Sequence, residues 1–201
     1  MPDPRLARLN DARFTNLMRL IDGMRDRGRS HKLEYPNVDP NDGGQNARAL
    51  FLLETPGRKS VASGFVSRCN DDDTAKNMGR AWDKAKLLRA DVLLWNVVPY
   101  YLSTKDKNRN ATSAQVRAAI PDTQAFVDAL PNLKAIVFCG RKAQRAIKCL
   151  RVPATVTKFE TFHTGAQAYN HQRRQKDIHE TFRKVARLLY PDVCPTTRDK
   201  T

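Results

Sequence analysis

The stretch of sequence that decides the fold is Ala49-Leu50-Phe51-Leu52-Leu53, followed at once by Glu54-Thr55-Pro56-Gly57. A short apolar run that ends in turn-forming residues is typical of a strand buried on both faces of a sheet. Two more apolar runs, Asp91–Val98 and Lys134–Cys139, predict buried strands, and the alternating run Thr155–Phe162 predicts another. Together these runs predict a sheet of four strands.

Helical patterns precede, separate and follow the four runs. We expect helices at Pro4–Arg27, Asp73–Leu88, Ser113–Ala129, Gly140–Leu150 and Gln172–Leu189. Strands that alternate with helices imply a parallel sheet with helices on both faces. The sequence therefore predicts an α/β fold, a three-layer sandwich with a central four-stranded parallel sheet.

The length of 201 residues suits one domain and is too short for two ordinary ones. We expect a single domain over residues 1–201, with an N-terminal helix and arm at 1–48, a core at 49–190 and a disordered tail at 191–201. No apolar run is long enough to span a membrane, and the N-terminus lacks the apolar core of a signal peptide. We therefore expect a cytoplasmic, nucleoid-associated monomer that does not bind membranes.

The chain is strongly basic. Lys and Arg outnumber Asp and Glu by 36 to 21, which gives a formal net charge of +15. Such an excess favours a polyanionic partner, either nucleic acid or an anionic membrane surface. The basic residues are scattered and are not gathered on one amphipathic helix, so nucleic acid is the preferred partner.

The four cysteines do not form a metal-binding pattern. They are Cys69, Cys139, Cys149 and Cys194. None belongs to a Cys-x-x-Cys pair, and no His lies at zinc-finger spacing from them. We expect neither zinc nor an iron–sulfur cluster, and no other cofactor. Cys139 and Cys149 are expected in the hydrophobic core.

Unusual polar residues follow three of the predicted strands. They are Glu54–Gly57, Asn96–Pro99 and His163–Gly165. In parallel sheets, ligands bind where loops leave the carboxyl ends of the strands. The three loops are therefore expected to form one site.

These loops resemble, in this order, the motifs of the uracil-DNA glycosylase superfamily. Leu53–Gly57 is similar to its first motif, Gly-x-x-Pro-Gly, and Phe65 is similar to the Phe of a Phe-Val pair in its thermophilic branch. Asn96 ends the middle motif, Cys139–Ala143 resembles a strand–Gly–helix unit, and His163 begins the last motif. The pattern is closest to the Gly-Glu-x-Pro-Gly branch, but the iron–sulfur cysteines of that branch have no counterpart here. The resemblance covers Ala49 to Leu189.

The resemblance implies a monofunctional enzyme that flips uracil, or a related deaminated base, out of DNA and hydrolyses its glycosidic bond. Phe65 would stack on the flipped ring, and the amide of Asn96 would read its edge. His163 would donate a hydrogen bond to the oxygen on which negative charge collects. Glu54 or Thr55 would orient the attacking water.

Two departures from the family pattern leave another interpretation open. Thr55 stands where classical members have Asp and mismatch-directed members have Asn, and a hydroxyl is a poor base. Leu53 replaces the usual Gly. A catalytically weak or inactive DNA-binding module on the same fold is therefore the alternative. An unrelated nucleotide-processing enzyme is disfavoured, because neither a phosphate-binding loop nor a dinucleotide fingerprint is present.

Further residues are candidates for contacts with DNA. A Leu wedge follows the catalytic His in classical members, and here Gln167 or Tyr169 would fill that role. The phosphate-contact candidates are Arg58, Lys59 and Ser60 on the first loop and Arg173 and Arg174 after the last. The acidic run Asp71–Asp73 is interpreted as a helix N-cap in preference to a metal cluster.

Overall fold

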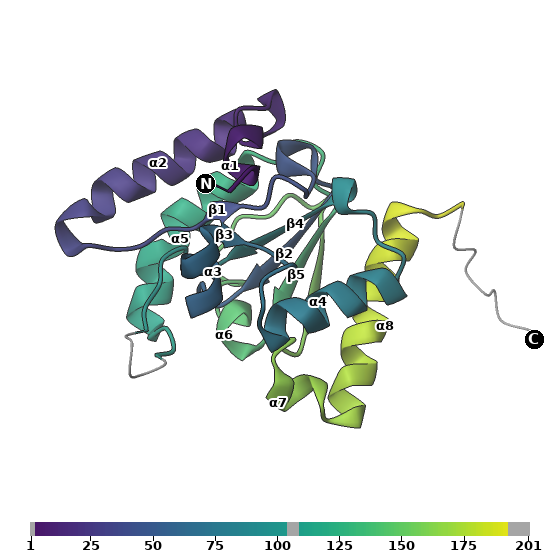
Figure 1. Cartoon of the computed structure of the whole chain (residues 1–201). Coiled ribbons are helices and arrows are strands. Elements are labelled where there is room, and N and C mark those ends of the chain that lie inside the picture. The colour runs from purple at the N-terminus through teal and green to yellow at the C-terminus, as the bar shows by residue number, and fades with distance from the viewer. Residues whose placement is uncertain (1–2, 104–108, 193–201) are drawn as a thin grey trace, which may run out of the picture.

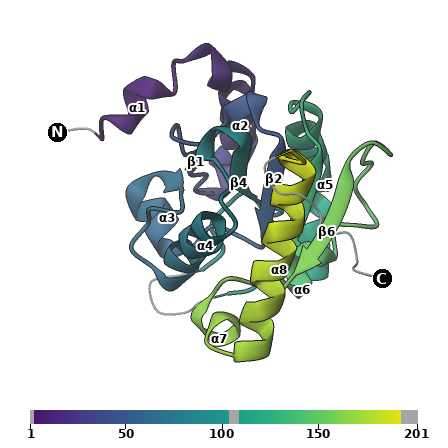
Figure 2. The same ribbon diagram turned by 90° about the vertical axis from the view of Figure 1, so that its right-hand side faces the viewer.

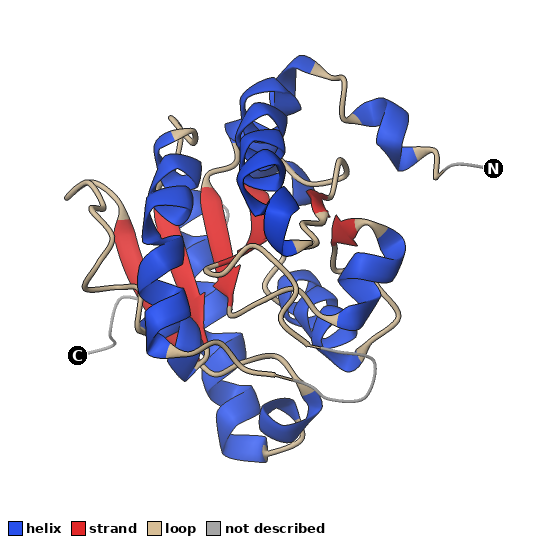
Figure 3. Cartoon of the chain, turned by 90° about the vertical axis from the view of Figure 1, so that its left-hand side faces the viewer, coloured by secondary structure: helices blue, strands red, loops and turns tan. Residues whose placement is uncertain are grey.

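The computed structural model describes residues 3–103 and 109–192 of the chain. Its central sheet has the strand order β4-β2-β5-β6, and all pairs are parallel. The sheet lies between helices in Figure 1, and its strands are drawn in red in Figure 3. The strands are β2 (Ala49–Leu53), β4 (Val92–Asn96), β5 (Ala135–Cys139) and β6 (Thr157–Thr161). The predicted four-stranded parallel sheet is confirmed. The tail expected from residue 191 lies outside the described residues from 193 onward.

Helices cover both faces of this sheet. Helices α2 (Thr15–Gly28) and α5 (Ser113–Asp128) lie on one face, and α4 (Asp73–Lys84) and α8 (Gln172–Leu189) lie on the other (Figures 1 and 2). The short helices are α1 (Arg5–Arg8), α3 (Arg58–Ser63), α6 (Arg141–Gln144) and α7 (Ala166–Tyr169). The predicted three-layer arrangement is thus present. None of the helices in the described ranges is long and apolar enough to cross a membrane.

The burial of the strands explains the layers. β2, β4 and β5 are buried at every position, whereas β6, at the edge of the sheet, is buried only at Thr161. Strands buried on both faces need helices on both sides. The alternating pattern of β6 fits an edge strand that has one exposed face, and its observed bounds are shorter than the predicted run Thr155–Phe162.

Side-chain caps fix the starts of two major helices. The side chain of Asp72 accepts a hydrogen bond from the backbone N–H of Ala75 and caps α4, which confirms the N-cap interpretation of the acidic run. Thr112 and Gln115 form a capping box at α5. These caps satisfy N–H groups that have no partner inside the helix.

The first predicted helix, Pro4–Arg27, is interrupted. The side chain of Asp11 accepts from the backbone N–H of Arg13 and starts a separate 3₁₀ turn at Ala12–Phe14. An Asp that bonds its own following backbone competes with helix formation, which divides α1 from α2. α2 ends at Gly28, where the sequence pattern places its end.

The structure contains short elements that the sequence analysis does not predict. β1 (Asn37–Val38) and β3 (Phe65–Val66) form a small parallel sheet, and α3 lies in the loop before β3. The helix predicted at Gly140–Leu150 shortens to α6 and irregular turns. Consequently Cys149 is exposed, so its prediction as a core residue is wrong, while Cys139 is buried as predicted.

A buried ionic cluster joins the N-terminal arm to the core. Arg89 donates hydrogen bonds to Asp39 at 2.8 Å and to Asp42 at 2.7 Å, and both carboxylates are fully buried. The hydroxyl of Ser67, which follows β3, also donates to Asp39. Although burial opposes it, the hydrogen bonds from Ser67 and Asn41 and the charge of Arg89 hold the pKa of Asp39 below its usual value. Burial raises the pKa of Asp42 to about 7.

The raised pKa of Asp42 in the folded protein predicts a pH dependence of stability. The folded protein holds a proton on Asp42 that the unfolded chain releases near its ordinary pKa, so this group's stabilisation is lost as pH rises towards 7. The unfolding free energy of Asp42→Asn minus that of the wild type should therefore rise by roughly 1–4 kcal/mol from about pH 5 to about pH 8. Urea unfolding at both pH values measures this gain. Asp39→Asn should instead destabilise at both, and an Asp42→Asn difference that does not change with pH would contradict the prediction.

Candidate active site

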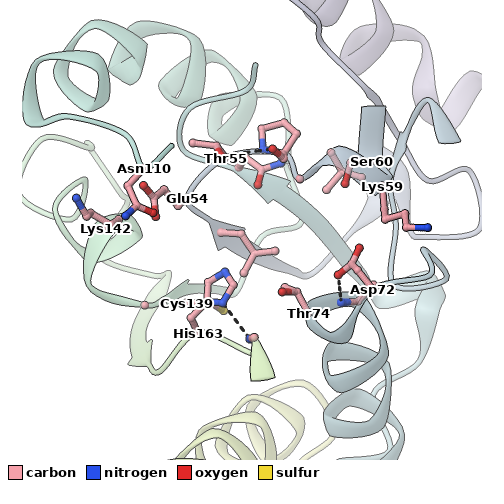
Figure 4. A pocket seen from close by; sticks show the side chains of 18 of the residues that line it. Glu54, Thr55, Lys59, Ser60, Asp72, Thr74, Asn110, Cys139, Lys142 and His163 are labelled. Atoms are coloured by element: carbon pink, nitrogen blue, oxygen red, sulfur yellow. Dashed lines mark hydrogen bonds between the residues drawn. The ribbon is translucent and has the colours of Figure 1, made fainter. Parts of the chain in front are cut away.

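A cleft of about 1620 Å³ lies at the carboxyl ends of the central strands. Glu54 and Thr55 after β2, Asn96 at the end of β4, Cys139 at the end of β5 and His163 after β6 all line it. Figure 4 shows Glu54, Thr55, Cys139 and His163 around this cleft. The parallel sheet thus brings together the three loops that the sequence predicted to meet.

Asn96 is the most unusual polar residue in the cleft. The residue is 1% exposed, yet neither its amide nitrogen nor its amide oxygen has a hydrogen-bond partner within the described residues. Leaving a buried amide unpaired is unfavourable by about 1–3 kcal/mol for each group. Such a group is expected to have a partner, so the amide is suited to a ligand that supplies one donor and one acceptor.

The backbone around Asn96 is rigidly held. The hydroxyl of Thr123 on α5 donates to the carbonyl of Val97 at 2.8 Å. The N–H of Val97 donates to the carbonyl of Leu53 at 2.9 Å, which extends the pairing of β4 with β2 past Asn96. The backbone that carries the Asn96 side chain is therefore held by the sheet and by α5.

His163 is oriented by its own loop. Its Nδ1 accepts a hydrogen bond from the backbone N–H of Gly165 at 2.9 Å (Figure 4). A neutral imidazole that accepts at Nδ1 carries its proton on Nε2 and is a donor there. Burial lowers the pKa of His163, and the charge of Asp72 opposes that shift. The imidazole is therefore a neutral donor at pH 7.

Two glycines make room for this imidazole. A Cβ atom at Gly165 would lie 2.9 Å from His163 Nδ1, and a Cβ atom at Gly140 would lie 3.0 Å from His163 Cβ. Gly140 also has a φ of 91°, a conformation that favours glycine. The strand–Gly–helix unit after β5 therefore packs directly against His163.

Glu54 and Thr55 differ in their contacts. The carboxylate of Glu54 accepts a hydrogen bond from the backbone N–H of Ala111 through Oε1. The carbonyl of Ala111 in turn accepts from Nζ of Lys142 at 3.3 Å. Thr55 donates only a long bond, of 3.4 Å, to the carbonyl of Pro56. One oxygen of Glu54 thus holds the loop before α5, and the other has no partner among the described residues.

Phe65 does not lie where the sequence analysis placed it. Its ring is fully buried and is not among the residues that line the cleft. The guanidinium of Arg5 lies 4.1 Å from the ring centroid. Phe65 therefore packs in the core, and the interpretation of its ring as a stacking surface is corrected. The next residues of the segment, Val66 and Ser67, line the cleft instead.

Comparison with known families supports the motif pattern. The family model of the uracil DNA glycosylase superfamily matches residues 40–187, which include the whole central sheet and the cleft residues named above. The chain belongs to this superfamily. No curated protein matches the chain.

The glycosylase-superfamily domain surrounds its cleft with cations. Arg58 and Lys59 of α3, which the sequence analysis selected, line the cleft. Arg141, Lys142 and Arg145, which it did not select, line the cleft from the segment after β5. The sequence feature that could have identified them is their position directly after a predicted strand, in the strand–Gly–helix unit.

The remaining candidates for DNA contacts fall into two groups. Ser60 and Gln167 line the cleft. Tyr169 does not, because its side chain is buried and its hydroxyl forms a 2.8 Å hydrogen bond with Nε2 of His179. Tyr169 is therefore corrected from a wedge candidate to a structural residue.

Arg173 and Arg174 lie at the start of α8, outside the residues that line the cleft. Arg173 is exposed, and the guanidinium of Arg174 lies 5.5 Å from the ring centroid of Phe162. Phe162 is itself exposed and directly precedes His163. These two arginines thus lie near the site in sequence but do not form its wall.

Helix α4 forms a wall of the cleft that the sequence analysis missed. Asp72, Thr74 and Ala75 line the cleft from its first turn, and Figure 4 shows Asp72 and Thr74 beside it. The N-cap interpretation of Asp72 was correct but incomplete, because a capping carboxylate has a second oxygen that faces elsewhere. No three His, Cys, Asp or Glu side chains within residues 3–103 and 109–192 gather closely enough to hold a metal ion.

The position of Asp72 predicts an effect on His163. Asp72→Asn keeps the cap, because Asn caps helices as well as Asp, but removes the negative charge. The pKa of His163 should then fall further below its usual value, because the charge of Asp72 acts to raise it. An NMR titration of the His163 ring measures this change. Asp73→Asn, which alters the exposed neighbour outside the cleft, is the matched control, and equal shifts in both variants would refute the prediction.

Proposed function

We propose that the protein is a monofunctional DNA glycosylase that hydrolyses the glycosidic bond of uracil, and of other deaminated bases, in DNA. The observation that carries this proposal is the unpartnered buried amide of Asn96 in the same cleft as the fixed donor of His163. A flipped base requires both an edge reader and a donor for the charge it acquires.

Base selection falls to Asn96. Its amide oxygen accepts from N3–H of uracil while its amide nitrogen donates to O4. Cytosine presents an acceptor and an amino group at the same positions, so with the amide in this orientation both contacts would be lost and two buried groups left unpaired. Because Phe65 is buried elsewhere, we assign contact with the faces of the base to the apolar residues Leu53, Val66 and Leu94, which line the cleft.

Bond cleavage falls to His163. As the C1′–N1 bond breaks, its electron pair leaves with the base and negative charge collects mostly at O2. The Nε2–H of a neutral His163 donates a hydrogen bond there and stabilises that charge without transferring its proton. The sugar becomes cation-like, and a water then forms a bond to C1′ and releases a proton.

Glu54 or Thr55 orients this water. Glu54 is favoured because a carboxylate can accept the released proton, whereas a threonine hydroxyl is a poor base. Its second oxygen is available for the water while the first holds the loop at Ala111. Thr55 lines the same cleft and contributes a hydroxyl beside it.

DNA is held by charge. Arg58, Lys59, Arg141 and Arg145 line the cleft on two different elements, which suits phosphates on both sides of a flipped nucleotide. Ser60 adds a hydroxyl to this set, and Arg173 and Arg174 extend the basic surface along α8. Gln167, which lines the cleft, fills the space that the flipped base leaves, because Tyr169 is buried.

A catalytically weak or inactive DNA-binding module is the alternative, and it is supported by Thr55 and by the engagement of Glu54 with Ala111. An excision assay separates the two functions. End-labelled oligonucleotides that carry one uracil, single- and double-stranded, are incubated with the protein and treated with alkali. Cleavage at the uracil supports the glycosylase. Binding without cleavage at uracil, hypoxanthine or xanthine would leave the inactive module.

His163→Ala should reduce excision by about 10²–10³-fold, because it removes the donor to the departing base. DNA affinity, measured by fluorescence anisotropy, should change little, since the phosphate contacts remain. Single-turnover excision rates measure the loss. An unchanged rate would remove His163 from the mechanism.

Asn96→Asp should abolish or relax the selection of uracil. A carboxylate accepts hydrogen bonds but offers no donor to O4, so one of the two contacts becomes repulsive. Competition between uracil- and cytosine-containing oligonucleotides measures the base profile. The same profile in variant and wild type would show that Asn96 is only a structural residue.

A further inference from the structure

A second buried amide lies behind the cleft, on helix α4. Asn77 is 4% exposed and does not line the cleft. Its Nδ2 donates a hydrogen bond of 2.9 Å to the carbonyl of Thr164, 87 residues away in the sequence. α4 is thereby joined directly to the loop that carries His163.

The orientation of this amide is fixed by its other neighbour. Nη1 of Arg80 donates to Oδ1 of Asn77 at 3.2 Å. A guanidinium has only donors, so the amide oxygen of Asn77 must face Arg80 and the amide nitrogen must face Thr164. The reverse orientation would bring two donors together and two acceptors together.

The carbonyl that Asn77 holds belongs to a particular peptide group. The carbonyl of Thr164 and the N–H of Gly165 form one peptide unit, and that N–H donates to Nδ1 of His163 at 2.9 Å. A peptide unit is planar and rigid, so an anchor on its oxygen also fixes the direction of its N–H. Thr164 is fully buried, and its hydroxyl donates to the carbonyl of Thr74 at 3.1 Å, a second attachment of this loop to α4.

These contacts form a continuous relay with one direction. Arg80 donates to Asn77, Asn77 donates to the Thr164 carbonyl, and the N–H of the same peptide donates to His163. Hydrogen bonds in such a chain polarise one another. Because every donor in this chain points towards the imidazole, the relay is expected to make the Nε2–H of His163 a stronger donor.

We propose that Asn77 is a positioning residue that, through the Thr164–Gly165 peptide, holds His163 in its Nε2–H tautomer and directs this donor into the cleft. The inference rests on the proposed role of His163 in excision. Arg80 is the charged outer end of the relay. The effect of the relay is largest when negative charge appears on the departing base, so it acts on the rate of bond cleavage and not on DNA affinity.

Asn77→Leu tests the relay, because it keeps a similar volume and removes both polar atoms. The single-turnover excision rate at saturating protein should fall by about 10-fold to 100-fold, as expected for a displaced catalytic group, while DNA affinity changes little. Arg80→Met, which removes only the outer donor, should give a smaller loss in the same direction.

Gln124→Leu is the matched control for lost stability. Gln124 is also a buried amide, and it donates to the carbonyl of Arg151 at 2.9 Å, but it does not line the cleft or contact the His163 loop. This variant should lose a comparable amount of thermal stability and keep its excision rate. In a wild type that excises uracil, equal excision rates in Asn77→Leu and Gln124→Leu would overturn the proposal.

A spectroscopic measurement tests the relay without relying on activity. Ring ¹⁵N NMR spectra, assigned with His163→Ala, report which nitrogen carries the proton and the pKa of the ring. The wild type should show the Nε2–H tautomer. Asn77→Leu should show a mixture of tautomers and a higher pKa, and Gln124→Leu should not. An unchanged tautomer in Asn77→Leu would overturn the relay, whereas a changed tautomer in a protein that excises no uracil would retain the relay and refute the proposed function.

Discussion

The parallel pairing of β2 with β4 on one side and with β5 on the other is the constraint on which the site depends. Parallel pairing sends all carboxyl ends to one edge of the sheet, so residues separated by more than a hundred positions meet there. The pairing also sets the level at which each strand ends, because Leu53 lies in register with Asn96. The first motif and the middle motif therefore face the cleft from the same level.

Two polar side chains of the cleft differ in whether the protein supplies a hydrogen-bond partner. Asn96 is left without a protein partner, whereas the Nδ1 of His163 is engaged by its own loop. The unpaired amide of Asn96 is unfavourable until a ligand binds, and it favours only a ligand with the matching donor and acceptor. The engagement of His163 lowers the reorganisation needed when charge develops. In the proposed function, the recognising group is thus left without a protein partner, whereas the group that assists bond cleavage is already held by one.

The sequence predicts those elements of the fold whose apolar pattern extends over five or more residues. The runs Ala49–Leu53 and Ala135–Cys139 are strands in which every position is apolar, and this pattern needs no tertiary information. β1 and β3 have two residues each, too few for any pattern, and their pairing buries Phe65. The motif therefore located the segment of Phe65 but not the direction of its ring. Asn77 was missed for a related reason, since its partner Thr164 is distant in sequence and only the packing of α4 brings them together.

The departure at Thr55 and the engagement of Glu54 with Ala111 weaken the water side of the proposed reaction more than the leaving-group side. Thr55 cannot replace a carboxylate as a base, and Glu54 shares its oxygens between the cleft and Ala111. By contrast, the donor to the departing base is supported by three successive hydrogen bonds from α4 and its loop. When the bond to the base breaks well before water attacks, stabilising the departing anion lowers the barrier without a strong base. The distribution of polar contacts in this chain therefore favours a mechanism in which departure of the base, and not activation of the water, is the step that the protein assists most.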